Sequence, residues 1–390
     1  MLPEASRAKT IQPFHVMRLL ARARELERAG RDIVHMEVGE PDFPTPQTII
    51  DAGQKAIASG QMHYTPATGL PALKQHIAQH YRHTYQCEVD PASIVITPGA
   101  SGALLLALAC MVEPGKNILL ADPGYPCNRN FTRFLNGEVK SIAVDASTQY
   151  QLTAALIAEH WDENTVGVIL ASPSNPTGTL LTTDVMQAIV ELVKQHNGVI
   201  VMDEIYHGLV YQQQAHTVLE FTDNAFVINS FSKFYGMTGW RLGWLVAPTQ
   251  YRTALDNFAQ NIFLAAPTPS QHAALAAFTP ETTQILLARR EEFQRRRDYL
   301  LPAIVQLGFE VKVTPQGAFY IYANCSRFTD DSMRFCETLL EEAGVAITPG
   351  HDFGDYRAAQ HVRFAYTTGL DRLHEGVRRI GEFITAYPNL

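Results

Sequence analysis

A single lysine is flanked by small hydroxyl residues in the stretch Ser230-Phe231-Ser232-Lys233, and Arg241 follows it by eight positions. A lysine amine condenses with an aldehyde once burial or a neighbouring cation has lowered its pKa. Two hydroxyl groups and a guanidinium suit a phosphate ester. The stretch therefore predicts a site for an aldehyde that also carries a phosphate ester. Taken in isolation, the same stretch also fits a Gly-rich loop with a solvated lysine.

Two polar residues follow apolar segments further upstream. Asp203 comes directly after residues 199–202, which are too apolar for a surface strand, so its carboxylate needs a partner. A protonated ring nitrogen would be such a partner, and a helix N-cap is the alternative. Asn175 lies in an Asn-Pro-Thr-Gly turn after another apolar segment, and a turn without any ligand is its alternative.

Anion binding is predicted at two further places. Gly99, Ala100 and Ser101 lead from an apolar segment into residues 103–112, so they can present backbone N–H groups at a helix N-terminus. An ordinary strand-to-helix turn is the alternative. Arg363 lies in the apolar segment 361–365, where an unpaired guanidinium is costly. It predicts a site for a carboxylate, with a structural ion pair as the alternative.

The segments that must position these residues alternate between extended and helical patterns, which is typical of an α/β fold. Short, apolar, β-branched segments at 94–97, 117–120, 166–170, 199–202 and 226–229 predict strands buried on both faces of a largely parallel sheet. Residues 14–29 have apolar positions at helical spacing before Gly30, and a charged helix is expected through 289–297. Open sheets of this kind bind ligands at the carboxyl ends of their strands.

Length and composition predict two domains in one chain of 390 residues that is 46% hydrophobic. We expect an N-terminal arm at 1–45 that joins the smaller domain, a large domain at 46–280, and a smaller C-terminal domain at 281–390. Shorter strands are expected around 317–322 and 362–366 in that smaller domain.

Charge and cysteine content exclude several classes of protein. A formal net charge of −8 gives no electrostatic reason to expect nucleic acid or an anionic membrane as partner. No apolar run is long enough to cross a bilayer, and the first seven residues lack the apolar core of a signal peptide, so we expect a cytoplasmic enzyme. The five cysteines are scattered without a CxxC pair, which predicts free thiols and no metal site.

These motifs resemble those of the class I/II aminotransferases, the fold-type I enzymes that depend on pyridoxal 5'-phosphate (PLP), over nearly the whole chain. The resemblance implies that Lys233 holds the aldehyde of PLP as a Schiff base and that Asp203 pairs with the ring nitrogen. It also implies that Tyr206 and Asn175 donate hydrogen bonds to the phenolic oxygen of the ring. For Tyr206, core packing is the alternative.

The resemblance implies roles for the remaining candidates as well. Tyr125 corresponds to the aromatic residue that lies over the ring, and Tyr64 to a tyrosine that the neighbouring subunit supplies to the phosphate, which requires a homodimer. The α-carboxylate of the substrate is assigned to Arg363, with Asn175 and the backbone N–H of Gly39 beside it. The phosphate is assigned to Gly99, Ala100, Ser101, Ser230, Ser232 and Arg241.

Together these assignments predict an aminotransferase that moves an amino group from an L-amino acid to a 2-oxo acid with ping-pong kinetics, with Lys233 as general base. Relatives that favour dicarboxylic donors often carry a lysine in place of Ser101, so we expect neutral or aromatic donors. Phe14, Tyr125, Phe319 and residues 263–266 are candidates for an apolar side-chain pocket, although each also fits a core. A PLP-dependent C–S β-lyase on the same fold is the alternative function, and a PLP-sensing binding protein is a weaker one.

Overall fold

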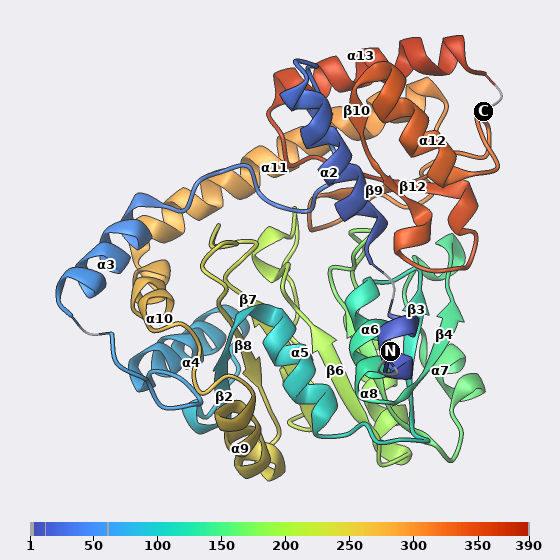
Figure 1. The fold of residues 1–390 in the computed structure, drawn as a ribbon. Coiled ribbons are helices and arrows are strands. Elements are labelled where there is room, and N and C mark those ends of the chain that lie inside the picture. The colour runs from blue at the N-terminus through green and yellow to red at the C-terminus, as the bar shows by residue number, and fades with distance from the viewer. Residues whose placement is uncertain (1–3, 12, 61, 389–390) are drawn as a thin grey trace.

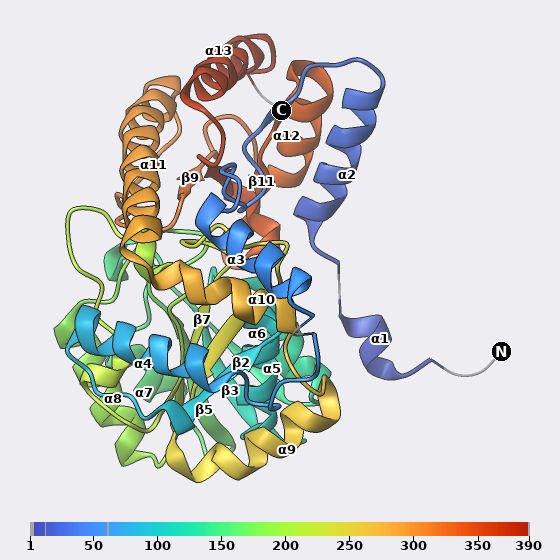
Figure 2. The ribbon, with the colours of Figure 1, turned by 90° about the vertical axis from the view of Figure 1, so that its left-hand side faces the viewer.

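A seven-stranded sheet forms the centre of the larger part of the protein. The computed structural model describes residues 4–11, 13–60 and 62–388, and Figures 1 and 2 show its arrangement from two sides. The strands lie in the order β2-β8-β7-β6-β5-β3-β4. Their bounds are β2 Ile94–Thr97, β3 Asn117–Asp122, β4 Glu138–Ala143, β5 Thr165–Ala171, β6 Val199–Asp203, β7 Ala225–Ser230 and β8 Gly243–Val246.

The predicted parallel sheet is confirmed, with one exception to the direction of its strands. All five predicted strands are present, and β8 alone runs antiparallel to its neighbours β2 and β7. Two strands were not predicted. The edge strand β4 has mostly polar or exposed positions. The buried strand β8 is as short as β2, but it begins with a glycine and has one β-branched residue, Val246, where β2 has four. Neither strand therefore has the β-branched, apolar run on which the other five were predicted.

Alternate residues of each central strand enter two separate hydrophobic cores. Leu119 and Val168 pack on one side, together with residues of α4 (Pro71–Tyr85), α7 (Ala154–His160) and α8 (Thr183–Gln195). Ile118 and Ile169 pack on the other side, against α5 (Gly99–Ala109), α6 (Pro126–Phe134) and α9 (Arg252–Ile262). Helices cover both faces of the sheet, so a ligand can contact the strands only at their ends.

A second body combines the N-terminal and C-terminal segments around a core of its own. Figure 1 shows α2 (His15–Arg28) beside the elements of the C-terminal segment. The shared core includes residues of α2, β9 (Tyr320–Asn324), β12 (His361–Ala365) and α13 (Leu370–Ala386). The strands β9, β12 and β11 (Thr348–Pro349) form an antiparallel sheet, and β1 (Val34–His35) pairs in parallel with β10 (Val345–Ala346). The domain boundaries at 45 and 280 stay predictions.

One long helix joins the two bodies. Figure 1 shows α11 (Pro280–Leu307) running from α10 (Thr268–Ala274) to α13. The other helices are α1 Ser6–Thr10, α3 Gln47–Ala58 and α12 Ser332–Thr338, followed by a π-helical turn at Leu339–Ala343. Among the residues that the structure describes, no helix is both long and apolar enough to span a lipid bilayer.

Candidate active site

The carboxyl ends of β6 and β7 face a small cavity of about 140 Å³. Asp203 is the last residue of β6 and Ser230 the last residue of β7, and these two strands are paired in parallel. Eight predicted site residues line the cavity together, although they come from four separate parts of the sequence: Ala100, Ser101, Tyr125, Asp203, Ser230, Ser232, Lys233 and Arg241.

Gly99 begins α5 at the edge of this cavity. Its φ is +71°, and a Cβ atom at this position would lie 2.4 Å from Nη2 of Arg241. A larger residue would therefore be strained and would displace the guanidinium. The close approach keeps the first turn of α5 beside Arg241, which gives an anion both a helix N-terminus and a cation.

Lys233 is held in the cavity by the backbone of a distant segment. Its Nζ donates a hydrogen bond of 2.7 Å to the carbonyl oxygen of Gly39. Burial is the main cause that lowers the pKa of Lys233 to about 8; the positive charges of Arg363 and Arg241 act in the same direction, whereas Glu40 opposes them. A larger fraction of the amine is therefore neutral and nucleophilic near pH 7 than for an ordinary lysine.

Asp203 lines the same cavity without a cation paired to it in the described part of the chain. Its Oδ1 accepts one hydrogen bond, from the backbone N–H of Ile205 at 3.1 Å. Burial raises the pKa of Asp203 to about 6, against the opposing effects of that hydrogen bond and of Lys233. A carboxylate in this position would be stabilised by a cationic group within the cavity.

Arg363 is 4% exposed and lies between two aromatic rings. Its Cζ is 4.2 Å from the ring centre of Tyr320 and 4.8 Å from that of Phe353. Nη1 donates to Oδ1 of Asn175 at 2.9 Å, and Nη2 donates to the carbonyl oxygen of Glu37 and to Oγ1 of Thr348. Nε is buried without a partner, and no carboxylate is paired with Arg363 among the described residues. The structural ion pair expected as the alternative is therefore absent from that part of the chain.

Tyr320 is a site residue that the sequence analysis did not single out. Its hydroxyl is 2.9 Å from the hydroxyl of Tyr206, and its ring stacks on Arg363. A Cβ atom on Gly39 would lie 1.8 Å from the hydroxyl of Tyr320, so only glycine fits there. The tyrosine thus contacts three predicted site residues at once. It belongs to the predicted strand around 317–322, but the sequence contains no signal for the direction of its side chain.

The chain matches the family described as aminotransferase class I and II over residues 31–380. It is 39% identical over 376 residues to the valine–pyruvate aminotransferase of Mycobacterium tuberculosis, covering 96% of this chain and 97% of the relative. The aspartate aminotransferase of Geobacillus stearothermophilus is 32% identical over 394 residues, covering 98% and 99%. A crystal structure of an aminotransferase from Mycobacterium tuberculosis superposes with a TM-score of 0.96 at 38% identity, covering 99% of this chain and all of that one. The chain belongs to the class I and II aminotransferases.

This aminotransferase uses PLP, and the residues around Lys233 fit that cofactor. The cavity presents an amine of lowered pKa for the aldehyde and a carboxylate without a cation for the ring nitrogen. Ser230, Ser232 and Arg241 line the same cavity, and two hydroxyls with a guanidinium are a set of donors that suits a phosphate. The close approach of Gly99 to Arg241 places the first turn of α5 and the guanidinium side by side.

The remaining predicted residues lie around this cavity in different ways. Phe14 stacks on Tyr125 with ring centres 6.5 Å apart, whereas Phe319 is fully buried in the core of the second body. Leu264, in the predicted pocket stretch 263–266, is 57% exposed. Tyr64 is 82% exposed and is not among the residues that line the cavity of its own chain.

Proposed function

We propose that the enzyme transfers the amino group of a neutral or aromatic L-amino acid to a 2-oxo acid with ping-pong kinetics. The observation that carries this proposal is Arg363, a buried guanidinium with no carboxylate partner among the described residues, beside the amide of Asn175. A substrate α-carboxylate would provide the missing charge. When bound, PLP supplies an aldehyde that takes up the amino group and returns it to the acceptor, and a ring that withdraws electrons.

We propose the following residues as the cofactor site. Lys233 would hold the aldehyde, Asp203 the ring nitrogen, and Tyr206 and Asn175 the phenolic oxygen, with Tyr125 against the ring. Gly99, Ala100, Ser101, Ser230, Ser232 and Arg241 would hold the phosphate. The cavity supports part of this division, because its carboxylate, Asp203, ends β6 whereas Arg241 lies between β7 and β8. Tyr206, Asn175 and Gly99 are not among the residues that line it.

The substrate is held and deprotonated by the chain's own residues in this proposal. Arg363 binds the α-carboxylate, with Asn175 and the backbone N–H of Gly39 next to it. The Nζ atom of Lys233 accepts the proton of the donor α-carbon, because a neutral amine of pKa about 8 is a suitable base near neutral pH. Tyr320 positions both Tyr206 and Arg363 through its hydroxyl and its ring.

The preference for neutral donors is supported by the charges in the cavity. Among the described residues that line it, the cations are Lys233 and Arg241, and both are already assigned to the cofactor. No further cation is available there for the side-chain carboxylate of a dicarboxylic donor. Ser101 contributes a hydroxyl to the lining in place of a charge. The names of the relatives include both a valine and an aspartate aminotransferase, so the choice of donor needs a direct assay.

We further propose a homodimer with shared active sites and a cytoplasmic location. Tyr64 is exposed in its own chain, which supports its predicted contact with the phosphate of the neighbouring subunit. All five cysteines are free thiols, the state that reducing compartments maintain.

A half-reaction screen tests the proposed function. The PLP-loaded enzyme is incubated with one amino acid at a time and no acceptor, and the 2-oxo acid released is measured for alanine, valine, phenylalanine, aspartate and glutamate. Neutral or aromatic donors should react fastest and should release one 2-oxo acid per active site. Fastest reaction with aspartate would overturn the donor preference. A cysteine S-conjugate is added to the panel as the substrate of a C–S β-lyase. Release of ammonia, pyruvate and the thiol from that conjugate, with no stoichiometric 2-oxo acid from the five amino acids, would overturn amino transfer.

A further inference from the structure

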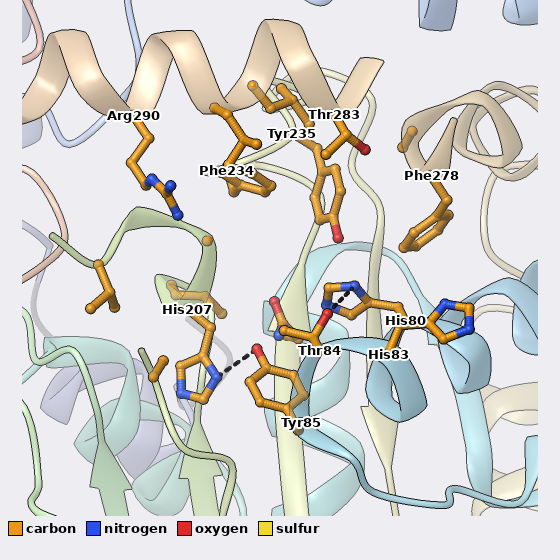
Figure 3. A pocket seen from close by; sticks show the side chains of 18 of the residues that line it. His80, His83, Thr84, Tyr85, His207, Phe234, Tyr235, Phe278, Thr283 and Arg290 are labelled. Atoms are coloured by element: carbon orange, nitrogen blue, oxygen red, sulfur yellow. Dashed lines mark hydrogen bonds between the residues drawn. The ribbon is translucent and has the colours of Figure 1, made fainter. Parts of the chain in front are cut away.

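A second and larger cavity, of about 470 Å³, lies on the other side of the residues that follow β6. It is bounded by α4, by the segment after β6, by the two residues that follow Lys233, and by the start of α11 (Figure 3). Ile205 lines this cavity and the Lys233 cavity alike. The two cavities are therefore separate spaces with a common wall, and none of the roles proposed above uses the larger one.

Aromatic side chains form one wall of this cavity. Tyr235 lies 5.2 Å from Phe234 and 5.6 Å from Phe278, measured between ring centres. Leu286 of α11 and Trp244 of β8 also line the space. The volume falls within the range of about 300–1,000 Å³ that is usual for sites of small organic ligands. A planar, apolar ligand body would find matching surfaces here.

Most polar groups around the cavity already have partners. The Nδ1 atom of His207 is 3.0 Å from the hydroxyl of Tyr85, and that of His80 is 3.2 Å from Oγ1 of Thr84 (Figure 3). Burial lowers the pKa of His207 to about 3 and that of His80 to about 4, so both rings are neutral near pH 7. These two histidines therefore contribute neutral rings to the cavity wall and no positive charge for an anionic ligand.

Arg290 differs from its neighbours on α11 because its guanidinium makes no hydrogen bond and no ion pair in the described part of the chain. Arg295 and Arg296 donate to Glu292, and Arg297 donates to Asp298. Figure 3 shows the Arg290 side chain pointing from α11 into the space above His207. The described residues that line the cavity include no aspartate or glutamate, and Arg290 is the lining residue with a guanidinium.

A second donor or acceptor is also unused at this cavity. Nδ1 of His76 is buried without a hydrogen-bond partner, and its ring stacks on Phe278 at 6.1 Å between ring centres. Buried polar atoms in proteins are nearly always paired. Nδ1 itself has almost no accessible surface, so a ligand in the cavity would contact the ring of His76 and not this atom. The charge that a ligand could pair with at this cavity is therefore the guanidinium of Arg290.

We propose that this cavity binds a small aromatic carboxylate, which pairs with Arg290 and packs its ring against Phe234, Tyr235 and Phe278. An aromatic acid without an amino group fits better than a zwitterion, because the described lining offers no carboxylate for an ammonium group. Phe234 and Tyr235 directly follow Lys233 in the sequence. The ligand would therefore contact the loop that carries the catalytic lysine without entering the active site.

Calorimetric titration of the PLP-loaded enzyme with 1-naphthoate tests this site. This acid has neither an amino nor an oxo group, so it cannot be turned over. Arg290→Gln removes the proposed partner, and Arg295→Gln is the matched control, because it removes the same charge from the same helix at an exposed position outside the cavity. Thr283→Trp fills the cavity from its rim and leaves Arg290 in place. Arg363→Gln reveals binding in the active site.

The proposal expects a naphthoate site that Arg290→Gln weakens about tenfold or more, the loss typical of a hydrogen bond to a charged group. Thr283→Trp should remove the same site, while Arg295→Gln and Arg363→Gln should retain it. The uncharged 1-naphthamide should bind equally to the wild type and to Arg290→Gln. Identical naphthoate binding in the wild type, Arg290→Gln and Thr283→Trp would overturn the proposal. Loss of all binding in Arg363→Gln would overturn it too, since the acid would then bind only in the active site.

Discussion

Replacing Arg363 by glutamine should separate recognition of the α-carboxylate from the rest of the reaction. A guanidinium has five N–H donors, and the structure assigns three of them, to Asn175, Glu37 and Thr348. Two donors, including the buried Nε–H, are left for a carboxylate. At about 1.5–3 kcal/mol for each charged hydrogen bond, their loss corresponds to about 3–6 kcal/mol. With tenfold per 1.4 kcal/mol, kcat/KM should fall about 10²- to 10⁴-fold.

The assay compares an amino acid with the amine that lacks its carboxylate, for example phenylalanine with phenethylamine, in single-turnover reactions. The wild type should strongly prefer the amino acid, and Arg363→Gln should lose most of that preference while its slow reaction with the amine is unchanged. Arg296→Gln, which removes another arginine that is 4% exposed but is paired with Asp42 and Glu292, controls for a general loss of buried charge. A fall of less than tenfold, or an equal fall for amino acid and amine, would refute the reasoning.

Three further predictions concern the Lys233 cavity. The pKa of Lys233 is lowered from 10.5 to about 8, so the neutral amine dominates above about pH 8. Uptake of PLP by the cofactor-free enzyme, followed by stopped-flow absorbance, should therefore accelerate as pH rises through about 8. A midpoint near 10.5 would contradict this prediction. Asp203→Asn should lower kcat/KM at least a hundredfold, because loss of one partner of a buried ion pair costs about 3–5 kcal/mol. Asp203→Glu keeps the charge and should retain more activity. Equal activity of Asp203→Asn and the wild type would exclude the proposed pairing with the ring nitrogen. Tyr320→Phe keeps the ring on Arg363 but removes the hydroxyl near Tyr206. It should shift the pH dependence of the absorbance of lysine-bound PLP and leave KM for the amino acid within about threefold, because the lost hydrogen bond is made to Tyr206 and not to Arg363. A large rise in KM without a spectral shift would mean that the tyrosine acts through Arg363 instead.

The central sheet could be predicted because its inner strands are apolar on successive positions. Ile118 and Ile169 are buried on one face of the sheet, and Leu119 and Val168 on the other, so the apolar residues of these strands follow one another directly in the sequence. The edge strand β4 has no such apolar run, since most of its positions are polar or exposed. The strand β8 is as long as β2, but its glycine and its single β-branched residue do not distinguish it from a loop.

The candidate site was predictable where a residue type is unusual for its surroundings. A carboxylate after a buried strand and an arginine within one both require partners, so Asp203 and Arg363 stand out in the sequence. Tyr320 does not stand out, because an aromatic residue is ordinary in a buried strand. Its contact with Gly39 and Tyr206 joins segments that are far apart in the chain. The second cavity could not be predicted for the same reason, because its walls come from segments that are far apart in the sequence.

Borohydride reduction of the PLP-loaded enzyme, followed by peptide mapping, tests the central claim most directly, because reduction makes the bond between PLP and its lysine permanent. The account predicts one modified peptide per chain, the one that contains Lys233, and no modified peptide from Lys233→Ala. A modified side chain at any other position, or an enzyme that acquires neither colour nor a modified peptide after incubation with PLP, would contradict the account.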